Sequence, residues 1–383
     1  MAKKSKEGFG AEIDNIFADI DKINPEAAFL NNSTLSKVDS WIDTGCYALN
    51  VICSGSLYKG VPSGRITGFV GPSATGKSFI INKIIGNAQK KGRFAVGFDT
   101  EVAIDEGSVI NVGGDPTRFK HVPIETIGEA RNQMNRFLTN VNNAGQRSKF
   151  IMSIDSLGNL ISTKEKADIL AGKDAMDMGA RAREMKSFIR SITYPVARAD
   201  IPVLFSNHVY DDPSAMFDSM VKNQSGGKAI QYLASLAVQL SVTQEKSGAT
   251  GSNVNRDATE DVSPIARKGV NGVTIRALTI KNRFAPPFLE AELYLNFTTG
   301  LEKYSGLLDM AVGYGAIIQT GTTYTLLDGK KLGFYKQWRS DETLWEETIL
   351  PELEKQLQAK LKFNNATEPE EIETEEEETT DEV

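Results

Sequence analysis

The sequence predicts an α/β fold in which helices cover both faces of a mostly parallel sheet. Apolar, strand-like segments alternate with helical segments between about residues 65 and 205, an order typical of parallel sheets. Polar residues suited to ligand binding stand at or just after four of the strand ends, and ligands in such sheets bind at that edge. These residues are Ser73, Glu101, Asp155 and His208.

A glycine-rich loop joins the first strand-like segment, residues 65–70, to a helical segment. The loop reads Gly71-Pro72-Ser73-Ala74-Thr75-Gly76-Lys77-Ser78, the spacing of a loop that binds nucleotide phosphates. Its glycines let successive N–H groups face a phosphate, and the helix N-terminus adds positive potential. We expect Lys77 to reach the β- and γ-phosphates of ATP and the Ser78 hydroxyl to complete a Mg²⁺ shell. An ordinary Gly/Ser turn is the alternative, which the flanking strand and helix disfavour.

The remaining elements of the predicted core continue the alternation. Strands are expected at residues 93–98, 149–154 and 202–205, and helices at 126–141 and 177–199. The pattern then becomes β-rich, with strands expected at 237–243, 273–281 and 291–296 and a mobile loop at 247–256. A compact α/β piece follows, with a helix at 305–317, a hairpin near Asp328-Gly329 and a final helix from about Asp341.

Hydrolysis of a γ-phosphate needs a metal anchor and a group that activates water. Asp155 closes an apolar strand, so we expect it to hold Mg²⁺ through water. Ser156 follows where many motor ATPases place a glutamate, and Glu101 on the adjacent strand is the comparable carboxylate, which we assign as general base. An ordinary solvated carboxylate is the alternative. His208 is expected to sense the γ-phosphate, although a lone histidine is more often structural, and His121 is interpreted as structural.

Two long segments, residues 157–176 and 209–228, leave the same predicted sheet edge. The first contains Lys164, Lys166 and Lys173, and the second contains Ser225-Gly226-Gly227-Lys228. Backbone N–H groups at the two glycines, with Arg183 and Arg190 nearby, suit the phosphodiesters of a second ligand. Few aromatic residues accompany them, so base stacking is expected to be minor.

The two ends of the chain differ from its body. Residues 1–37 form an N-terminal arm, in which an amphipathic helix at 11–23 either packs on the chain's own core or docks on a neighbouring subunit. Residues 38–302 form the predicted core, and 303–365 a small C-terminal domain. The chain carries a net charge of −7, but residues 367–383 hold ten acidic and no basic side chains, so the rest carries +3. We expect 366–383 to be a disordered acidic tail.

Composition points to a soluble protein of a reducing compartment. The two cysteines, Cys46 and Cys53, have no companion cluster for a metal site, and such a small number favours the cytosol. No run of about 18 apolar residues and no signal-peptide core is found, so a cytoplasmic location without a membrane partner is expected.

Further motifs occur in the order seen in one known family. They are Ile42-Asp43-Thr44-Gly45, Phe98-Asp99-Thr100-Glu101, Ile154-Asp155-Ser156-Leu157-Gly158-Asn159-Leu160, Lys281-Asn282-Arg283-Phe284-Ala285-Pro286-Pro287-Phe288 and Tyr304-Ser305-Gly306-Leu307-Leu308-Asp309-Met310. With the phosphate loop, they resemble the RecA family of ATP-dependent homologous recombinases from about residue 38 to 350. The likeness is greatest to the branch of T4-like bacteriophages, which implies a host cell's cytoplasm as location.

The resemblance implies roles for individual residues. Glu101 matches the catalytic glutamate, and His208 stands where bacterial relatives have glutamine and the phage branch has histidine. Lys281 and Arg283 match a basic pair that reaches the γ-phosphate of the neighbouring subunit. The loops after Asp155 and His208 match two DNA-binding loops. The residues on DNA-contacting positions are Met178, Gly179, Arg183, Arg190, Ser225, Gly226 and Gly227.

The implied activity is that of a DNA-dependent ATPase with a RecA-type core. It would form filaments on single-stranded DNA and promote pairing and strand exchange with homologous duplex DNA in recombination, repair and recombination-dependent replication. A single-stranded-DNA-binding protein and a mediator protein are implied partners. Two other classes stay open. A ring-forming helicase would carry a larger N-terminal domain and an arginine finger in place of Lys281-x-Arg283. A nucleotide-switched assembly protein would lack ATP turnover stimulated by single-stranded DNA.

Overall fold

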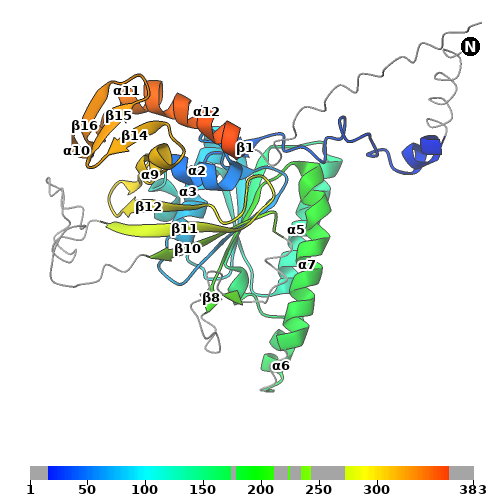
Figure 1. Ribbon diagram of the computed structural model, residues 1–383. Helices are drawn as coiled ribbons and strands as arrows, with labels where there is room; N and C mark the ends of the chain where they lie inside the picture. The colour runs from blue at the N-terminus through cyan, green and yellow to red at the C-terminus, as the bar shows by residue number, and fades with distance from the viewer. Residues whose placement is uncertain (1–15, 174–177, 211–222, 225–233, 243–271, 362–383) are drawn as a thin grey trace, which may run out of the picture.

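The computed structural model describes residues 16–173, 178–210, 223–224, 234–242 and 272–361. The main sheet comprises β3 (Ile66–Val70), β4 (Phe94–Asp99), β5 (Phe119–Pro123), β6 (Phe150–Asp155), β7 (Val203–Asn207), β10 (Leu236–Val242), β11 (Gly272–Asn282), β12 (Glu290–Asn296) and β13 (Gly300–Leu301). Among the described residues its order is β13-β12-β11-β10-β3-β7-β6-β4-β5 (Figure 1). The strands from β10 to β5 are parallel, and β11 to β13 are antiparallel. The predicted mostly parallel α/β fold is confirmed.

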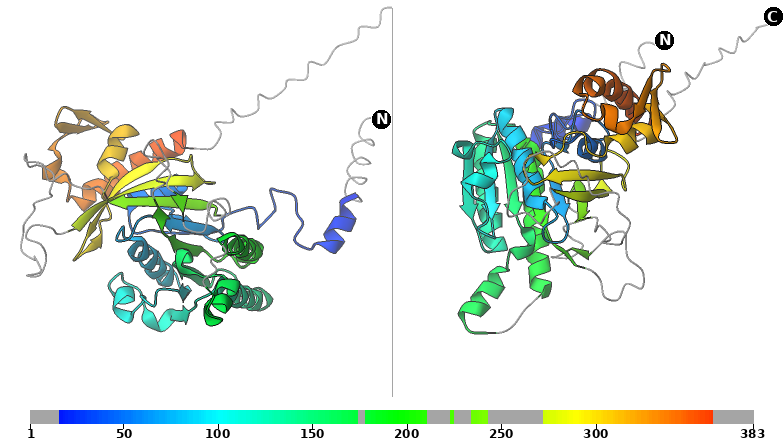
Figure 2. Two further views of the ribbon diagram at one scale, coloured as in Figure 1. Left: turned by 90° about the horizontal axis from the view of Figure 1, so that it is seen from below. Right: turned by 90° about the vertical axis from the view of Figure 1, so that its left-hand side faces the viewer.

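Neighbouring residues of the central strands belong to two separate hydrophobic cores. Ile151 and Leu204 pack in one core, and the adjacent Met152 and Val203 pack in the other, because successive strand side chains point to opposite faces. The first core includes α3 (Lys77–Lys90), and the second includes α5 (Ile127–Asn143) and α7 (Met178–Ala199). Helices therefore cover both faces of the sheet, as Figure 2 shows.

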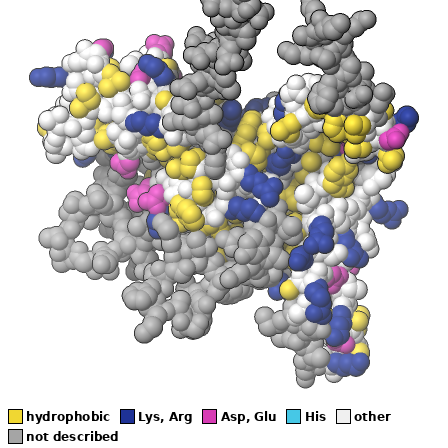
Figure 3. Space-filling view, turned by 45° about the vertical axis from the view of Figure 1, so that its right-hand side comes forward, with side chains coloured by type: hydrophobic (Ala, Val, Ile, Leu, Met, Phe, Trp, Pro, Cys, Tyr) yellow, Lys and Arg dark blue, Asp and Glu magenta, His cyan; other side chains and the backbone are white. Residues whose placement is uncertain are grey.

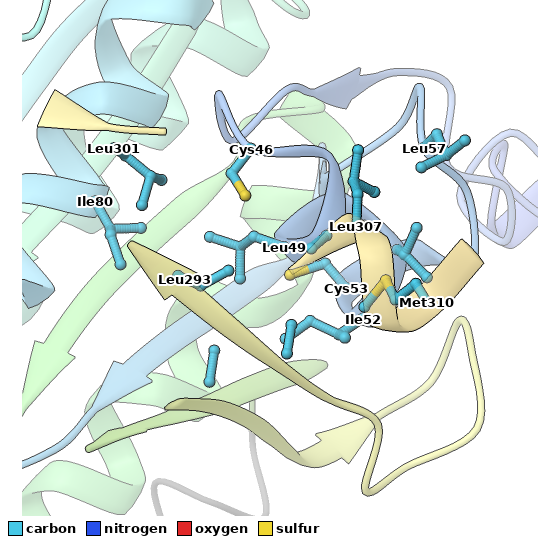
Figure 4. Packing of buried hydrophobic residues seen from close by; sticks show 14 of the residues in the cluster. Cys46, Leu49, Ile52, Cys53, Leu57, Ile80, Leu293, Leu301, Leu307 and Met310 are labelled. Carbon is cyan, nitrogen blue, oxygen red and sulfur yellow. The ribbon is translucent and has the colours of Figure 1, made fainter. Parts of the chain in front are cut away.

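The C-terminal elements share the first core with the N-terminal part of the chain. They are α9 (Leu307–Gly313), a three-stranded sheet of β14 (Ile317–Thr320), β15 (Thr323–Leu326) and β16 (Lys331–Phe334), and then α10 (Tyr335–Trp338), α11 (Glu342–Leu344), a π-helix (Trp345–Ile349) and α12 (Leu350–Lys360). Leu307 and Met310 of α9 pack against α2 (Tyr47–Ser54) (Figure 4). Tyr47 donates to Glu346 at 3.0 Å, and Ser56 donates to Glu354 at 2.7 Å. The division of the chain at residue 302 stays a prediction.

The described part of the N-terminal arm extends away from the body of the molecule (Figure 2). Residues 16–23 are helical, and 70% of the Ile16 surface and 86% of the Ile23 surface are exposed. Phe17 contacts Phe29, also in the arm, with ring centroids 5.6 Å apart. The apolar stripe is thus not buried against the chain's own core over these residues, which leaves it available to another surface.

Several elements differ from the sequence-based prediction. The helix α2 was not predicted, because its eight residues are too few to establish a helical period. The helix expected at 305–317 ends at Gly313, the chain turns at Gly315 with φ +80°, and β14 begins at Ile317. The edge strand β5 was also missed. The loop expected at 247–256 lies outside the described residues.

The segment expected to be irregular from 157 to 176 contains regular structure. A 3₁₀ turn, η2 (Leu157–Asn159), is followed by α6 (Thr163–Leu170). Ser162 caps α6 by accepting from the Glu165 amide at 3.0 Å, and the Glu165 carboxylate accepts from the Ser162 amide. This Ser-x-x-Glu capping box is a helix-start signal that the sequence already contained.

The remaining described elements are short. They are β1 (Trp41–Ile42), β2 (Val61–Pro62), α4 (Glu106–Ile110), η1 (Pro116–Arg118), β8 (Val209–Tyr210) and β9 (Asn223–Gln224). None of the helices that the model describes has the length and apolar character needed to span a bilayer.

Candidate active site

The glycine-rich loop connects β3 to α3 at the carboxyl edge of the sheet. Gly76 caps α3 with φ +78°, a conformation that other residues rarely adopt. A Cβ at Gly71 would lie 2.4 Å from the Leu240 carbonyl oxygen, so only glycine fits there. The Thr75 hydroxyl donates to the Pro72 carbonyl at 2.9 Å and closes the loop on itself. The loop is thus folded as a cradle at a helix N-terminus, where anions bind.

Lys77 is the buried cation of this cradle. Only 7% of its surface is exposed, and its Nζ donates to the carbonyl oxygens of Gly71 at 3.1 Å and Pro72 at 2.7 Å. Burial lowers the pKa of Lys77, an effect opposed by the charges of Asp155 and Glu101. An incoming phosphate would offer the ammonium group a full negative charge, a stronger partner than the two carbonyls.

Asp155 and Ser78 supply oxygen atoms suited to Mg²⁺. Asp155 ends β6 with 8% of its surface exposed, and its Oδ1 accepts a hydrogen bond from Ser206 on β7. Ser78 is exposed in the first turn of α3, directly after Lys77. Over the described residues there is no group of three or more His, Cys, Asp or Glu side chains that would hold a metal alone. One carboxylate, one hydroxyl and substrate phosphates fit Mg²⁺, which prefers such mixed oxygen shells.

Glu101 lies beside His208, as expected from the position of both residues after strand ends at one edge of the sheet. Glu101 Oε1 accepts from Ser156 Oγ at 3.0 Å and from Asn159 Nδ2 at 2.9 Å, and it lies 3.5 Å from His208 Nε2. Both donors, Ser156 and Asn159, follow β6, and His208 follows β7. They fix the carboxylate in orientation, as a general base requires. The roles of Ser156 and Asn159 were missed, although both follow Asp155 closely.

Asp99 and His121 support the turn that carries Glu101. Asp99 is fully buried, and its carboxylate accepts from the amides of Glu101 at 2.9 Å and Ile104 at 3.0 Å. His121 Nε2 lies 3.0 Å from the same carboxylate. Burial opposes ionisation of Asp99, but these hydrogen bonds prevail and lower its pKa. His121 is therefore part of the support of the site, in accord with its structural interpretation.

Lys281 and Arg283 lie away from these residues. Asn282 pairs with Leu236, which pairs with Thr67 near the start of β3, whereas the phosphate loop follows the end of β3 at Val70. Three residues of strand separate the two levels by roughly 10 Å along the sheet. Burial, followed by the charge of Arg283, lowers the pKa of Lys281. The pair therefore faces the opposite edge of the sheet from the phosphate loop of its own chain.

Basic residues line the exposed surface of α6 and α7. Arg183 and Arg190 are exposed on α7 and, seven residues apart, share one face of the helix. Figure 3 shows Lys and Arg side chains gathered along this part of the molecule. Gly179 lies in the first turn of α7, and Met178 begins it. Ser225, Gly226 and Gly227 lie outside the described residues.

Comparison with known proteins gives a consistent result. Residues 11–302 match the family described as the RecA N-terminal domain. The chain is 27% identical over 307 residues to Protein RecA of Leptospira biflexa, covering 77% of this chain and 70% of that protein. It is 29% identical over 351 residues to Protein RecA of Frankia casuarinae, covering 91% and 92%, and 28% identical over 320 residues to that of Rhodococcus jostii, covering 84% and 83%. The matched range includes every strand of the large sheet and all of the candidate site residues.

Proposed function

The chain belongs to the RecA family, and on that premise we propose that it is a DNA-dependent ATPase that assembles on single-stranded DNA and promotes homologous pairing and strand exchange. The meeting of Glu101 with Asn159 and His208 carries this proposal. Asn159 and His208 stand at the starts of two long segments that leave the sheet beside the phosphate loop. DNA held by those segments would lie next to the carboxylate that orients water.

In the proposed reaction, Glu101 accepts a proton from the water that attacks the γ-phosphorus of ATP. The bond from that phosphorus to the β–γ bridging oxygen breaks, and ADP and phosphate are the products. Lys77 and the N–H groups of residues 71–78 stabilise the charge on the β- and γ-phosphates. Ser78 and Asp155 would hold Mg²⁺, which would supply further charge neutralisation when bound. His208 would hydrogen-bond the γ-phosphate and so report its presence.

We place Lys281 and Arg283 at the γ-phosphate of the adjacent subunit. The strand register directs them away from their own phosphate loop, and two cations close together suit a triphosphate supplied by another chain. A head-to-tail contact of this kind repeats without closing on itself unless its rotation closes a ring. ATP bound at this contact would couple nucleotide state to filament form.

The N-terminal arm is proposed to hold adjacent subunits together. An apolar pocket of about 380 Å³ lies beside the edge strand β5 and is lined by Phe94, Phe119, Phe137 and Phe150, among others. Leu30 in the arm is 77% exposed. An open sheet edge and an apolar pocket are both surfaces to which a segment of another chain can bind. We propose that the arm of a second copy of this chain binds there.

Removal of residues 1–30 tests the arm. The shortened chain should stay folded, because Ile16 and Ile23 contribute little to its core, and should bind ATP weakly, yet sediment as a monomer in the presence of ATP and DNA. Filaments of normal length would show that the arm does not join subunits. A chain lacking only residues 1–10 is the matched control and should still form filaments.

Within the family, the motifs favour a recombinase similar to the UvsX protein of T4-like bacteriophages. His208 supports this proposal, because the resemblance described above implies histidine at this position in the phage branch and glutamine in bacterial relatives. A phage recombinase would act in the cytoplasm of its host. It would depend on a single-stranded-DNA-binding protein and on a mediator that loads it.

Electron microscopy with ATP and single-stranded DNA tests the proposed assembly. Helical filaments, together with ATP turnover that rises when single-stranded DNA is added, support a recombinase. Closed rings would favour the helicase class. Filaments whose ATP turnover does not respond to DNA would favour an assembly protein whose polymerisation is controlled by the bound nucleotide.

A further inference from the structure

We infer that Arg181 and Asn159 link the DNA-facing helix α7 to the carboxylate of Glu101, so that the position of α7 sets the orientation of the general base. The link has three parts: the contact of Asn159 with Glu101, the η2 turn that carries Asn159, and the grip of Arg181 on that turn. This inference rests on the proposed function, since it concerns how DNA stimulates ATP turnover.

The first part is the hydrogen bond from Asn159 Nδ2 to Glu101 Oε1 at 2.9 Å. Ser156 Oγ donates to the same oxygen at 3.0 Å. Two donors on Oε1 fix the orientation of the carboxylate group. The direction in which Oε2 points is thereby fixed as well. Because a general base works only when its free oxygen meets the proton it removes, a shift of either donor changes catalysis.

The second part is the η2 turn, whose backbone carries Asn159. Leu157 and Leu160 are both fully buried at its two ends, so the turn is anchored by packing on either side of Asn159. The Asn159 amide donates to the Ser156 carbonyl at 3.3 Å within the turn. The side chain of Asn159 is itself exposed, so its place depends on the backbone that carries it.

The third part is the attachment of this turn to α7. Arg181 Nε donates to the Leu160 carbonyl at 2.9 Å, and its Nη2 donates to the Gly158 carbonyl. One guanidinium thus binds carbonyl oxygens on both sides of Asn159, a two-pronged grip that its planar fork allows. Glu184, one turn further along α7, accepts from the amide and hydroxyl of Thr163 at 3.0 and 2.6 Å.

The proposed DNA contact of α7 and its contact with the η2 turn lie on different sides of the helix. Arg181 and Arg183 are two residues apart and therefore point to roughly opposite sides of the helix. Phosphates bound by Arg183 and Arg190 would pull on one side, and Arg181 would transmit the displacement to the η2 turn on the other. A rigid helix with a ligand site on one face and a gripped turn on the other is a physical route for coupling.

The test compares ATP turnover with and without single-stranded DNA for Arg181→Ala, Asn159→Ala and the double variant. Each single variant should lose about 2- to 30-fold of the stimulation by DNA, the range of coupling energies for such positions. In Arg181→Ala, turnover without DNA and affinity for an ATP analogue should change little, whereas Asn159→Ala should also lower turnover without DNA, because it removes a donor to Glu101. The double variant should lose no more than the stronger single variant, because the residues act in series.

Three controls keep the result interpretable. Arg181→Lys, which retains the charge and one donor direction, should recover part of the stimulation. Arg136→Ala removes an exposed arginine from α5 and should leave stimulation intact. Affinity for single-stranded DNA, measured by fluorescence anisotropy, should stay unchanged in the Arg181 and Asn159 variants, which a direct DNA-binding role would alter.

The outcomes separate this link from the proposed function. Full stimulation in both single variants, or losses that multiply in the double variant, would overturn the link while the ATPase assignment stands. Wild-type turnover that does not respond to DNA would instead overturn the proposed function.

Discussion

The two edges of the central sheet differ in what they bring together. At the carboxyl edge of the parallel strands, Lys77, Glu101, Asp155 and His208 come from four different strands or their following turns and surround one phosphate cradle. At the opposite level, the antiparallel β11 carries Lys281 and leads to Arg283, away from that cradle. The proposed ATP site therefore lies at one edge of the sheet, and the basic pair proposed to serve a neighbouring subunit lies at the other.

Replacement of Lys77 should cause the largest loss of ATP turnover among the variants considered. Lys77→Ala removes the cation proposed to bind the β- and γ-phosphates, so ATP turnover should fall about 10³-fold or more. A phosphate-release assay measures it. Lys90→Ala, at the other end of α3, is the matched control and should turn over normally. Undiminished hydrolysis by Lys77→Ala would remove the phosphate-loop argument.

Replacement of Glu101 should separate ATP binding from hydrolysis at the same edge. Glu101→Gln keeps the volume but removes the base, so hydrolysis should fall about 10²–10⁴-fold while ATP-dependent DNA binding persists. Single-turnover kinetics and filter binding measure the two properties. Glu106→Gln, in the nearby α4, is the control. Normal turnover by Glu101→Gln would mean that another group activates water.

Mixing two inactive variants sharpens the comparison between the edges. The double substitution Lys281→Ala/Arg283→Ala should be inactive alone, and so should Glu101→Gln. In equimolar mixed filaments, about a quarter of the contacts should join an intact Glu101 to an intact basic pair, if neighbours meet head to tail. Recovery of a matching fraction of wild-type turnover is expected. No recovery would place Lys281 and Arg283 outside the neighbour's site.

Arg276 provides the control for the mixing experiment. It lies on the same strand β11 but pairs with Glu290 on β12, far from the end that carries Lys281. Arg276→Ala should therefore remain active alone and need no complementing partner.

Removal of the proposed acidic tail should have the smallest effect, an effect on DNA affinity. Residues 366–383 can compete with phosphates for the basic face of α7, but only at short range, since the Debye length is about 8 Å at physiological salt. Their removal should tighten binding to duplex DNA roughly tenfold at low salt, and less as salt rises. A salt titration of affinity for full and shortened chains measures this. Equal affinities at low salt would favour a docking role for the tail.

The parallel core and its site edge followed from local patterns. The predicted strands before Gly71, Glu101, Asp155 and His208 agree with β3, β4, β6 and β7 to within about one or two residues, because buried parallel strands have continuous apolar sequence. Since parallel strands end at one edge, the closeness of Glu101 and His208 could be predicted as well. The helices α5 and α7 were equally visible from their amphipathic period.

Elements that depend on distant contacts were not visible in the sequence. The helix α2 is buried against α9 and the strands β11 and β12, and its eight residues are too few for a helical period to be recognised. The hydrogen bonds from Arg181 to the η2 turn join residues more than twenty positions apart. Nothing in the local sequence distinguishes Arg181 from an arginine whose side chain is exposed to solvent.

Local sequence thus defined the phosphate loop, the strand ends and the identity of the carboxylates, because those features depend on neighbouring residues and on the two-residue period of strands. Tertiary structure alone decided that Ser156 and Asn159 hold Glu101, that Lys281 and Arg283 face away from their own phosphate loop, and that the apolar stripe of the arm stays exposed. Each of these depends on how strands are ordered and registered across the sheet, and hydrophobic packing of the whole chain selects that order.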